Sequence, residues 1–307
     1  MAERRGGAKA ALPALALAFN AFVWGVSWWP FRELQGHGLH PLWATAGVYA
    51  VSLACLLAWR PRAWQGLAAH PGLWLLMLAS GMTNVGFNWA VTVGDVVRVV
   101  LLFYLMPAWA VLLAWLLLGE RPTGRALLRL LLALAGVAVV LKTPGTAWPL
   151  PESLADWLAL AGGFCFALTN ILLRQLRGAP ASTRIFAMFT GGTLTAAGAA
   201  MLGMGGGWVA APPLLPGPAL ALGLALSLGF LAGNMALQFG AARLKAQTTA
   251  LVMLSEVVFA SVSSVLAGAS EVSWRTWLGG ALILATAAWS AWPEAPTDGR
   301  ASAQSPA

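Results

Sequence analysis

Long apolar runs, separated by short polar or Pro/Gly-rich breaks, recur along the whole chain. A helix that crosses a membrane needs about 20 consecutive, predominantly apolar residues, and the breaks divide the chain into ten runs close to that length. Because the runs are continuous rather than short and alternating, they disfavour a membrane β-barrel. The sequence predicts an all-α integral membrane protein with ten transmembrane helices, over residues 11–31, 42–59, 71–91, 96–118, 125–142, 153–174, 183–204, 217–240, 246–268 and 274–292.

Charged residues are too few for an ordinary soluble protein. They make up 9% of the chain, whereas about a quarter of the residues of a typical soluble domain are charged. The two cysteines, Cys55 and Cys165, both lie in apolar runs, which predicts neither a disulfide framework nor a cysteine metal site. Phosphate-binding loops, dinucleotide fingerprints and metal-ligand clusters are absent from the sequence. We therefore expect no cofactor, no metal and no catalytic residue.

The basic residues predict the orientation of the helices. Lys and Arg concentrate in cytoplasmic loops of membrane proteins, and an N-terminus in the cytoplasm places fourteen of the eighteen basic residues on that side. The far side then receives the remaining four: Arg32, Arg98, Lys142 and Arg275. We expect an inner (plasma) membrane protein with both termini in the cytoplasm. Because the positive charge follows this topology, a nucleic-acid partner is not needed to explain it.

Two parts of the chain repeat each other. FVWGVSWWPFR at 22–32 can be laid on FCFALTNILLR at 164–174, and residues 116–124 can be laid on 267–275. The repeat divides the chain into a cytoplasmic N-terminal segment (1–10), a first five-helix repeat (11–142), a second five-helix repeat (143–292) and a disordered cytoplasmic tail (293–307). Five helices are an odd number, so the two repeats are predicted to be inverted. Inverted repeats are typical of secondary transporters that bind substrate near the bilayer midplane.

The repeated segments resemble a known family. The Trp24-Gly25-Val26-Ser27 patch, the segment from Pro107 to Glu120 and the second-half copy are similar to the EamA type of the drug/metabolite transporter superfamily, over about residues 12 to 292. ALVMLSEVVFASVSS at 250–264 most resembles the aromatic amino-acid exporters of the YddG kind. The resemblance implies a ten-helix basket with a central cavity, and the export of amino acids. Val258 stands where the first half has Pro107, so the family pattern is incomplete there.

Glu256 is the deepest charged residue, near the middle of the ninth apolar run. An acidic group at the bilayer centre costs roughly 3 kcal/mol, so such residues usually face a cavity or a partner. Its side chain is interpreted as a contact for the amino group of a substrate or as a protonatable coupling group. The alternative is a neutral acid that serves packing alone.

Amides inside the apolar runs form a second group of candidates. A spacing of four residues places two of them on one helix face in both halves, and amides offer both donors and acceptors, which suits a zwitterion. The alternative is interhelical hydrogen bonding, which is worth about 0.6 kcal/mol per bond in membranes. The amides in this group are Asn84, Asn88, Asn170, Asn234 and Gln238.

Aromatic residues, prolines and one charged pair complete the candidates. Tyr49 and Tyr104 carry hydroxyl groups that need a partner when buried, and Gly25, Pro30 and Pro107 are candidate hinges or gates because Gly and Pro weaken a helix. Asp95 and Arg98, three residues apart, predict an interfacial ion pair. The complete predicted substrate site contains Ser27, Trp28, Tyr49, Asn84, Asn88, Tyr104, Asn170, Asn234, Gln238 and Glu256.

These observations lead to one functional prediction and two alternatives. We predict a monomeric secondary transporter, embedded in membrane lipid, that exports amino acids, aromatic ones preferentially, and related small metabolites by alternating access. The first alternative is a broad-specificity drug or solute exporter. The distant alternative is a membrane-embedded lipid-modifying enzyme, which requires a buried catalytic constellation that the sequence lacks.

Overall fold

The structure is a computed structural model, and it describes residues 2–119, 122–142, 150–241, 243–244, 249, 252–270 and 273–290. All regular secondary structure in these ranges is helical, which confirms the predicted all-α class for this part of the chain. The helices are α1 (Ala2–Val26), α2 (Trp28–Gly36), α3 (Pro41–Trp59), the 3₁₀ helix η1 (Ala63–Gly66), α4 (Gly72–Val93), α5 (Val96–Phe103), α6 (Met106–Leu118), α7 (Gly124–Leu141), α8 (Leu154–Gln175), α9 (Ala181–Gly205), α10 (Gly217–Ala241), α12 (Ser255–Leu266) and α13 (Trp274–Ser290). Glu120, Glu271 and the predicted tail at 293–307 lie outside the described residues.

The described helices make the chain a multi-pass membrane protein. Seven segments of the described residues are long and apolar enough to cross a bilayer, whereas the sequence predicted ten. Two of the seven each contain two consecutive helices, α1 with α2 and α5 with α6. The helices outside this group are α4, the 12-residue α12 and the 17-residue α13. In α4 the cause is composition, because its buried face carries polar side chains: Ser80, Thr83, Asn84, Asn88 and Thr92.

Among the described residues, the first and fourth predicted spans are each broken near a proline. The first predicted span divides at Ser27 into α1 and α2, and the fourth divides after Phe103 into α5 and α6. Proline explains both breaks, because it lacks the N–H group that would bond the carbonyl four residues earlier and its ring crowds that carbonyl. Pro30 follows Val26 by four residues, and Pro107 follows Phe103 by four. Pro107 therefore lies in the first turn of α6. The sequence predicted it inside one continuous helix over 96–118, and that prediction is wrong.

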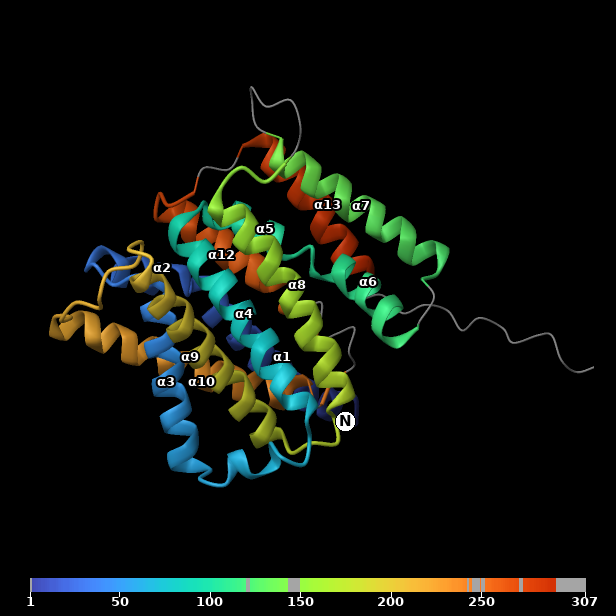
Figure 1. The fold of residues 1–307 in the computed structure, drawn as a ribbon. Helices are drawn as coiled ribbons and strands as arrows, with labels where there is room; N and C mark the ends of the chain where they lie inside the picture. Colours follow the sequence, from blue (N-terminus) through green and yellow to red (C-terminus); the bar gives the residue numbers. More distant parts are fainter. Residues whose placement is uncertain are drawn as a thin grey trace, which may run out of the picture.

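The helices pack in a bundle with α4 near its centre (Figure 1). Helix α4 packs against α8 and α9, whereas α1 packs against α10 and α12. Helices α7 and α13 lie side by side at one edge of the bundle (Figure 1). Glycines permit the closest contacts: a Cβ atom on Gly86 of α4 would lie 2.8 Å from the Leu158 carbonyl oxygen and 3.0 Å from the Gly162 Cα atom, both in α8.

Candidate functional site

A continuous series of aromatic rings occupies the interior of the bundle. Neighbouring rings have centroids 4.7 to 6.4 Å apart, the range in which aromatic pairs attract each other. The tightest pair is Trp24 of α1, which stacks on Phe230 of α10 at 4.7 Å. We call this series the aromatic chain, and it consists of Tyr49, Phe230, Trp24, Phe87, Phe103 and Tyr104, in order of contact.

The aromatic chain ends at a buried carboxyl group. The Tyr104 hydroxyl lies 3.2 Å from Glu256 Oε2 and donates at 3.1 Å to the Met253 carbonyl oxygen. Tyr104 follows the last residue of α5, and Glu256 lies in the first turn of α12. Their side chains are 2% and 7% exposed. The N-terminal end of a helix favours a negative charge, so the start of α12 suits this carboxyl group.

Four of the five predicted amides lie at least partly buried in α4 and α10. Asn88 of α4 is fully buried, and its Nδ2 atom donates to Thr45 Oγ1 at 3.3 Å, whereas its Oδ1 atom has no hydrogen-bond partner. Asn84 is also buried in α4. In α10, Gln238 is half-buried and the Oδ1 atom of Asn234 is buried without a partner. Asn88 and Asn234 therefore keep unused acceptors inside the protein.

Asn170 differs from its predicted position. It was grouped with the buried amides, but its side chain is exposed on α8. There it lines an open groove of about 350 Å³ between α6 and α8, which also includes Pro107. Among the described residues, the rings of the aromatic chain pack against one another in the bundle interior.

Ser27, Trp28 and Gly25 make local structural contacts. The Ser27 hydroxyl donates to the Trp24 carbonyl oxygen at 2.7 Å, at the break between α1 and α2. Trp28 Nε1 donates to Ser263 Oγ of α12 at 3.0 Å. A Cβ atom on Gly25 would lie 2.8 Å from the Glu256 carbonyl oxygen. Gly25 thus allows α1 to approach α12 directly beside the buried carboxyl group.

Asn20 is an interior polar residue that the sequence analysis missed. It lies in α1 and is 1% exposed. Its Nδ2 atom points to Met253 Sδ at 3.6 Å, and its Oδ1 atom has no partner. An asparagine within the first apolar run is visible in the sequence, and the rule that selected the other amides would have selected it too.

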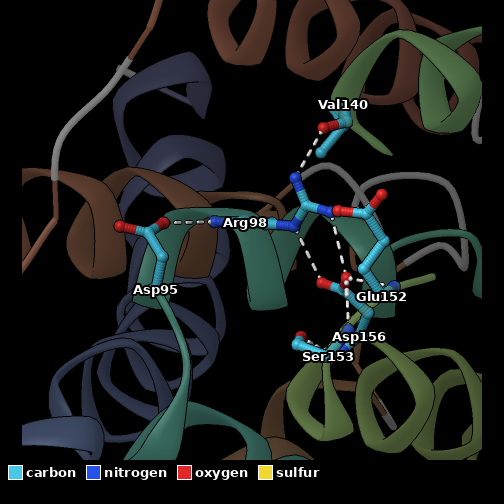
Figure 2. A network of polar contacts seen from close by, with 6 residues as sticks. All are labelled: Asp95, Arg98, Val140, Glu152, Ser153 and Asp156. Atoms are coloured by element: carbon cyan, nitrogen blue, oxygen red, sulfur yellow. Dashed lines mark hydrogen bonds and ion pairs between the residues drawn. The ribbon is translucent and has the colours of Figure 1, made fainter. Parts of the chain in front are cut away.

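An arginine–aspartate network joins three helices at one end of the bundle (Figure 2). Arg98 of α5 donates from Nε to Asp156 Oδ1 at 2.8 Å and from Nη2 to Asp156 Oδ2 at 2.9 Å. Its Nη1 atom donates to the Val140 carbonyl oxygen of α7 at 2.9 Å. The predicted ion pair between Asp95 and Arg98 is wrong: Asp95 Oδ1 instead accepts from the Arg98 backbone N–H as the N-cap of α5, and this leaves the guanidinium group directed to α8.

Arg32 binds backbone carbonyl groups at the same end of the bundle. It donates to the carbonyl oxygens of Val91 at 3.1 Å, Ala269 at 3.3 Å and Gly94. Val91 and Gly94 belong to the end of α4, where the last carbonyl groups have no partner within the helix. The guanidinium groups of Arg32 and Arg98 are therefore already occupied by protein acceptors. Among the described residues, no group of three or more His, Cys, Asp or Glu side chains could hold a metal ion.

Comparisons with known proteins identify part of the chain. Residues 11–142 match the EamA-like transporter family, and these bounds coincide with those of the predicted first repeat. No curated protein matches the chain. A solved structure described only as "Crystal structure of protein" shares 20% sequence identity, with coverage of 90% of this chain and 95% of its own chain and a TM-score of 0.54. That structure supports the fold alone, whereas the family match indicates a membrane transporter of small solutes.

Proposed function

We propose that this protein is a secondary transporter that exports amino acids, aromatic ones preferentially, and related small metabolites. The match of residues 11–142 to the EamA-like transporter family supports the proposal of transport. The observation that carries the proposal is the aromatic chain, which is buried among α1, α3, α4, α5 and α10 and ends at Tyr104 and Glu256. Aromatic rings can stack on an apolar or aromatic solute, and the carboxyl group can bind its polar end. The family match favours transport over the alternative of a lipid-modifying enzyme.

Equivalent helix contacts in the two halves support an inverted 5+5 repeat and alternating access. In the proposed repeat, α4 corresponds to α10 and α8 corresponds to α1. Helix α4 packs against α8, and α10 packs against α1 in the same way. Similarly, α5 and α6 pack against α8, and their counterpart α12 packs against α1. In such a repeat the halves exchange conformations around a site near the midplane.

Transport by purified protein tests the function. We expect proteoliposomes containing the full chain to take up labelled phenylalanine or tryptophan faster than empty vesicles. Glu256→Gln is expected to reduce the initial rate at least tenfold, because it removes the charge next to Tyr104. The matched control is Glu33→Gln, because Glu33 is exposed at α2. Uptake no faster than in empty vesicles would reject the substrate class, and a panel of competing drugs would reveal the alternative, a broad-specificity exporter.

We further propose that the protein lies in the inner membrane with both termini in the cytoplasm, as the distribution of basic residues indicates. A cytoplasm-active reporter such as a fluorescent protein, fused after Ala307, is expected to be active. A reporter that requires export, such as alkaline phosphatase, is expected to be inactive there and active when inserted after Gly38, between α2 and α3. The opposite pattern would reverse the orientation without affecting the transport proposal.

A further inference from the structure

Asn20 is an interior polar residue whose side-chain amide has few partners. Its side chain is 1% exposed, yet its Nδ2 atom meets only the sulfur of Met253 at 3.6 Å, and its Oδ1 atom has no partner. Sulfur is a weak acceptor, and a buried polar group without a hydrogen bond is destabilising. A Cβ atom on Gly233 of α10 would lie 3.2 Å from Asn20 Oδ1, so this oxygen packs closely against the Gly233 position.

Met253 contacts both Asn20 and Tyr104, the last residue of the aromatic chain. Its sulfur contacts Asn20, and its carbonyl oxygen accepts the hydrogen bond from Tyr104, whose hydroxyl also lies beside Glu256. The polar groups next to Met253 and Tyr104 are therefore the Asn20 amide, the Met253 carbonyl oxygen and the Glu256 carboxyl group, each of which includes an acceptor atom. Methionine side chains are unbranched and flexible, so the thioether of Met253 can move aside for a ligand without a change in the backbone.

The charge balance at this position favours a cation. Glu256 has no ion-pair partner among the residues that the structure describes. The two arginines nearest to the interior, Arg32 and Arg98, donate to carbonyl groups and to Asp156. A carboxylate buried without a partner is strongly unfavourable, so a positively charged group on a solute would stabilise Glu256.

We infer that Glu256, Asn20 and the Met253 carbonyl oxygen form the binding site for the protonated amino group of the transported solute. The inference rests on the proposed function and specifies its substrate class: a ring bound by the aromatic chain and an ammonium group bound at its end. An ammonium group has three N–H donors, which match these three acceptors. A carboxylate on the solute is not required, so aryl-alkyl monoamines are substrates together with aromatic amino acids.

Equilibrium binding to the full-length protein in lipid nanodiscs tests this inference. Labelled phenethylamine is displaced by three competitors: phenethylamine itself, phenylalanine and 3-phenylpropanoate, which is phenylalanine without its amino group. We expect phenylalanine to compete within about threefold of phenethylamine, and 3-phenylpropanoate to require at least a tenfold higher concentration. Glu256→Gln is expected to weaken phenethylamine binding at least tenfold and Asn20→Leu at least threefold, whereas the exposed control Glu33→Gln leaves it unchanged.

Further variants and ions separate the possible failures. Asn20→Asp keeps an acceptor at this position and is expected to retain binding, which distinguishes loss of the contact from misfolding. Equal competition by 3-phenylpropanoate and phenylalanine would overturn the inference and leave the proposed transport of aromatic solutes standing. Displacement by sodium chloride but not by potassium chloride would assign the site to an inorganic ion and would also overturn it. If no ring compound binds or is transported, both the inference and the proposed function fail.

Discussion

Replacing Asp156 with leucine is expected to lower the free energy of unfolding by about 3 kcal/mol, because removal of one partner from a buried ion pair costs about 3–5 kcal/mol. Asp156 is 2% exposed and forms a two-point contact with Arg98. It also accepts hydrogen bonds from the backbone N–H groups of Glu152 and Ser153 at the start of α8. We expect a value at the lower end of this range because Arg98 is 21% exposed. Denaturant titration in mixed micelles measures the change.

The double variant R98L/D156L separates the effect of an unpaired charge from the effect of changed packing. Removing both partners leaves no unpaired charge, and an apolar pair of similar volume is often as stable as a buried ion pair. We expect the double variant to be more stable than D156L alone. If D156L is as stable as the unchanged protein, the network at the ends of α5, α7 and α8 does not contribute to the fold.

Gly86→Leu is expected to disrupt the packing of α4 against α8. The atoms that a side chain would meet are a carbonyl oxygen and a Cα atom of α8, at 2.8 and 3.0 Å. Backbone atoms cannot rotate away as a side-chain end can, so we expect a loss near 3 kcal/mol, the upper end of the usual range for overpacking. Thermal unfolding followed by size-exclusion chromatography in detergent would measure it as a lower melting temperature.

Gly198→Leu provides the matched control. Gly198 lies in α9, another membrane helix that packs against α4, but a Cβ atom at this position has no neighbour within 4 Å. The same substitution is therefore expected to leave the melting temperature nearly unchanged. Equal effects at Gly86 and Gly198 would mean that helix propensity, rather than the close contact, determines the result.

The all-α class was predictable from the sequence, because long apolar runs favour membrane helices, but three of the ten predicted spans contain helices that are too short or too polar to meet that criterion. The breaks at Ser27 and after Phe103 were harder to predict, since proline marks a weak point but does not say whether the helix kinks or ends. The partner of Arg98 was not predictable: Asp95 is nearer along the chain, but Asp156 arrives from α8, 58 residues away. Contacts between distant segments require the three-dimensional arrangement.

For the candidate site too, the sequence identifies polar residues inside apolar runs but does not predict their contacts. Glu256 was identified because a charge inside an apolar run is visible in the sequence. Its contact with Tyr104 depends on the packing of α5 against α12. Asn170 satisfied the same compositional rule and yet is exposed on α8, because the sequence does not say which face of that helix turns inward.

The polar composition of α4 has a consequence for the biosynthesis of the protein. This helix buries polar side chains on a face that is covered by protein, and much of that cover comes from α8 and α9. A ribosome completes α8 and α9 only after residues 11–142 have left it. Until then, Asn84 and Asn88 lack these neighbours. The segment at 11–142 therefore depends on the later part of the chain to shield α4 from lipid, so its final assembly must follow the synthesis of both halves.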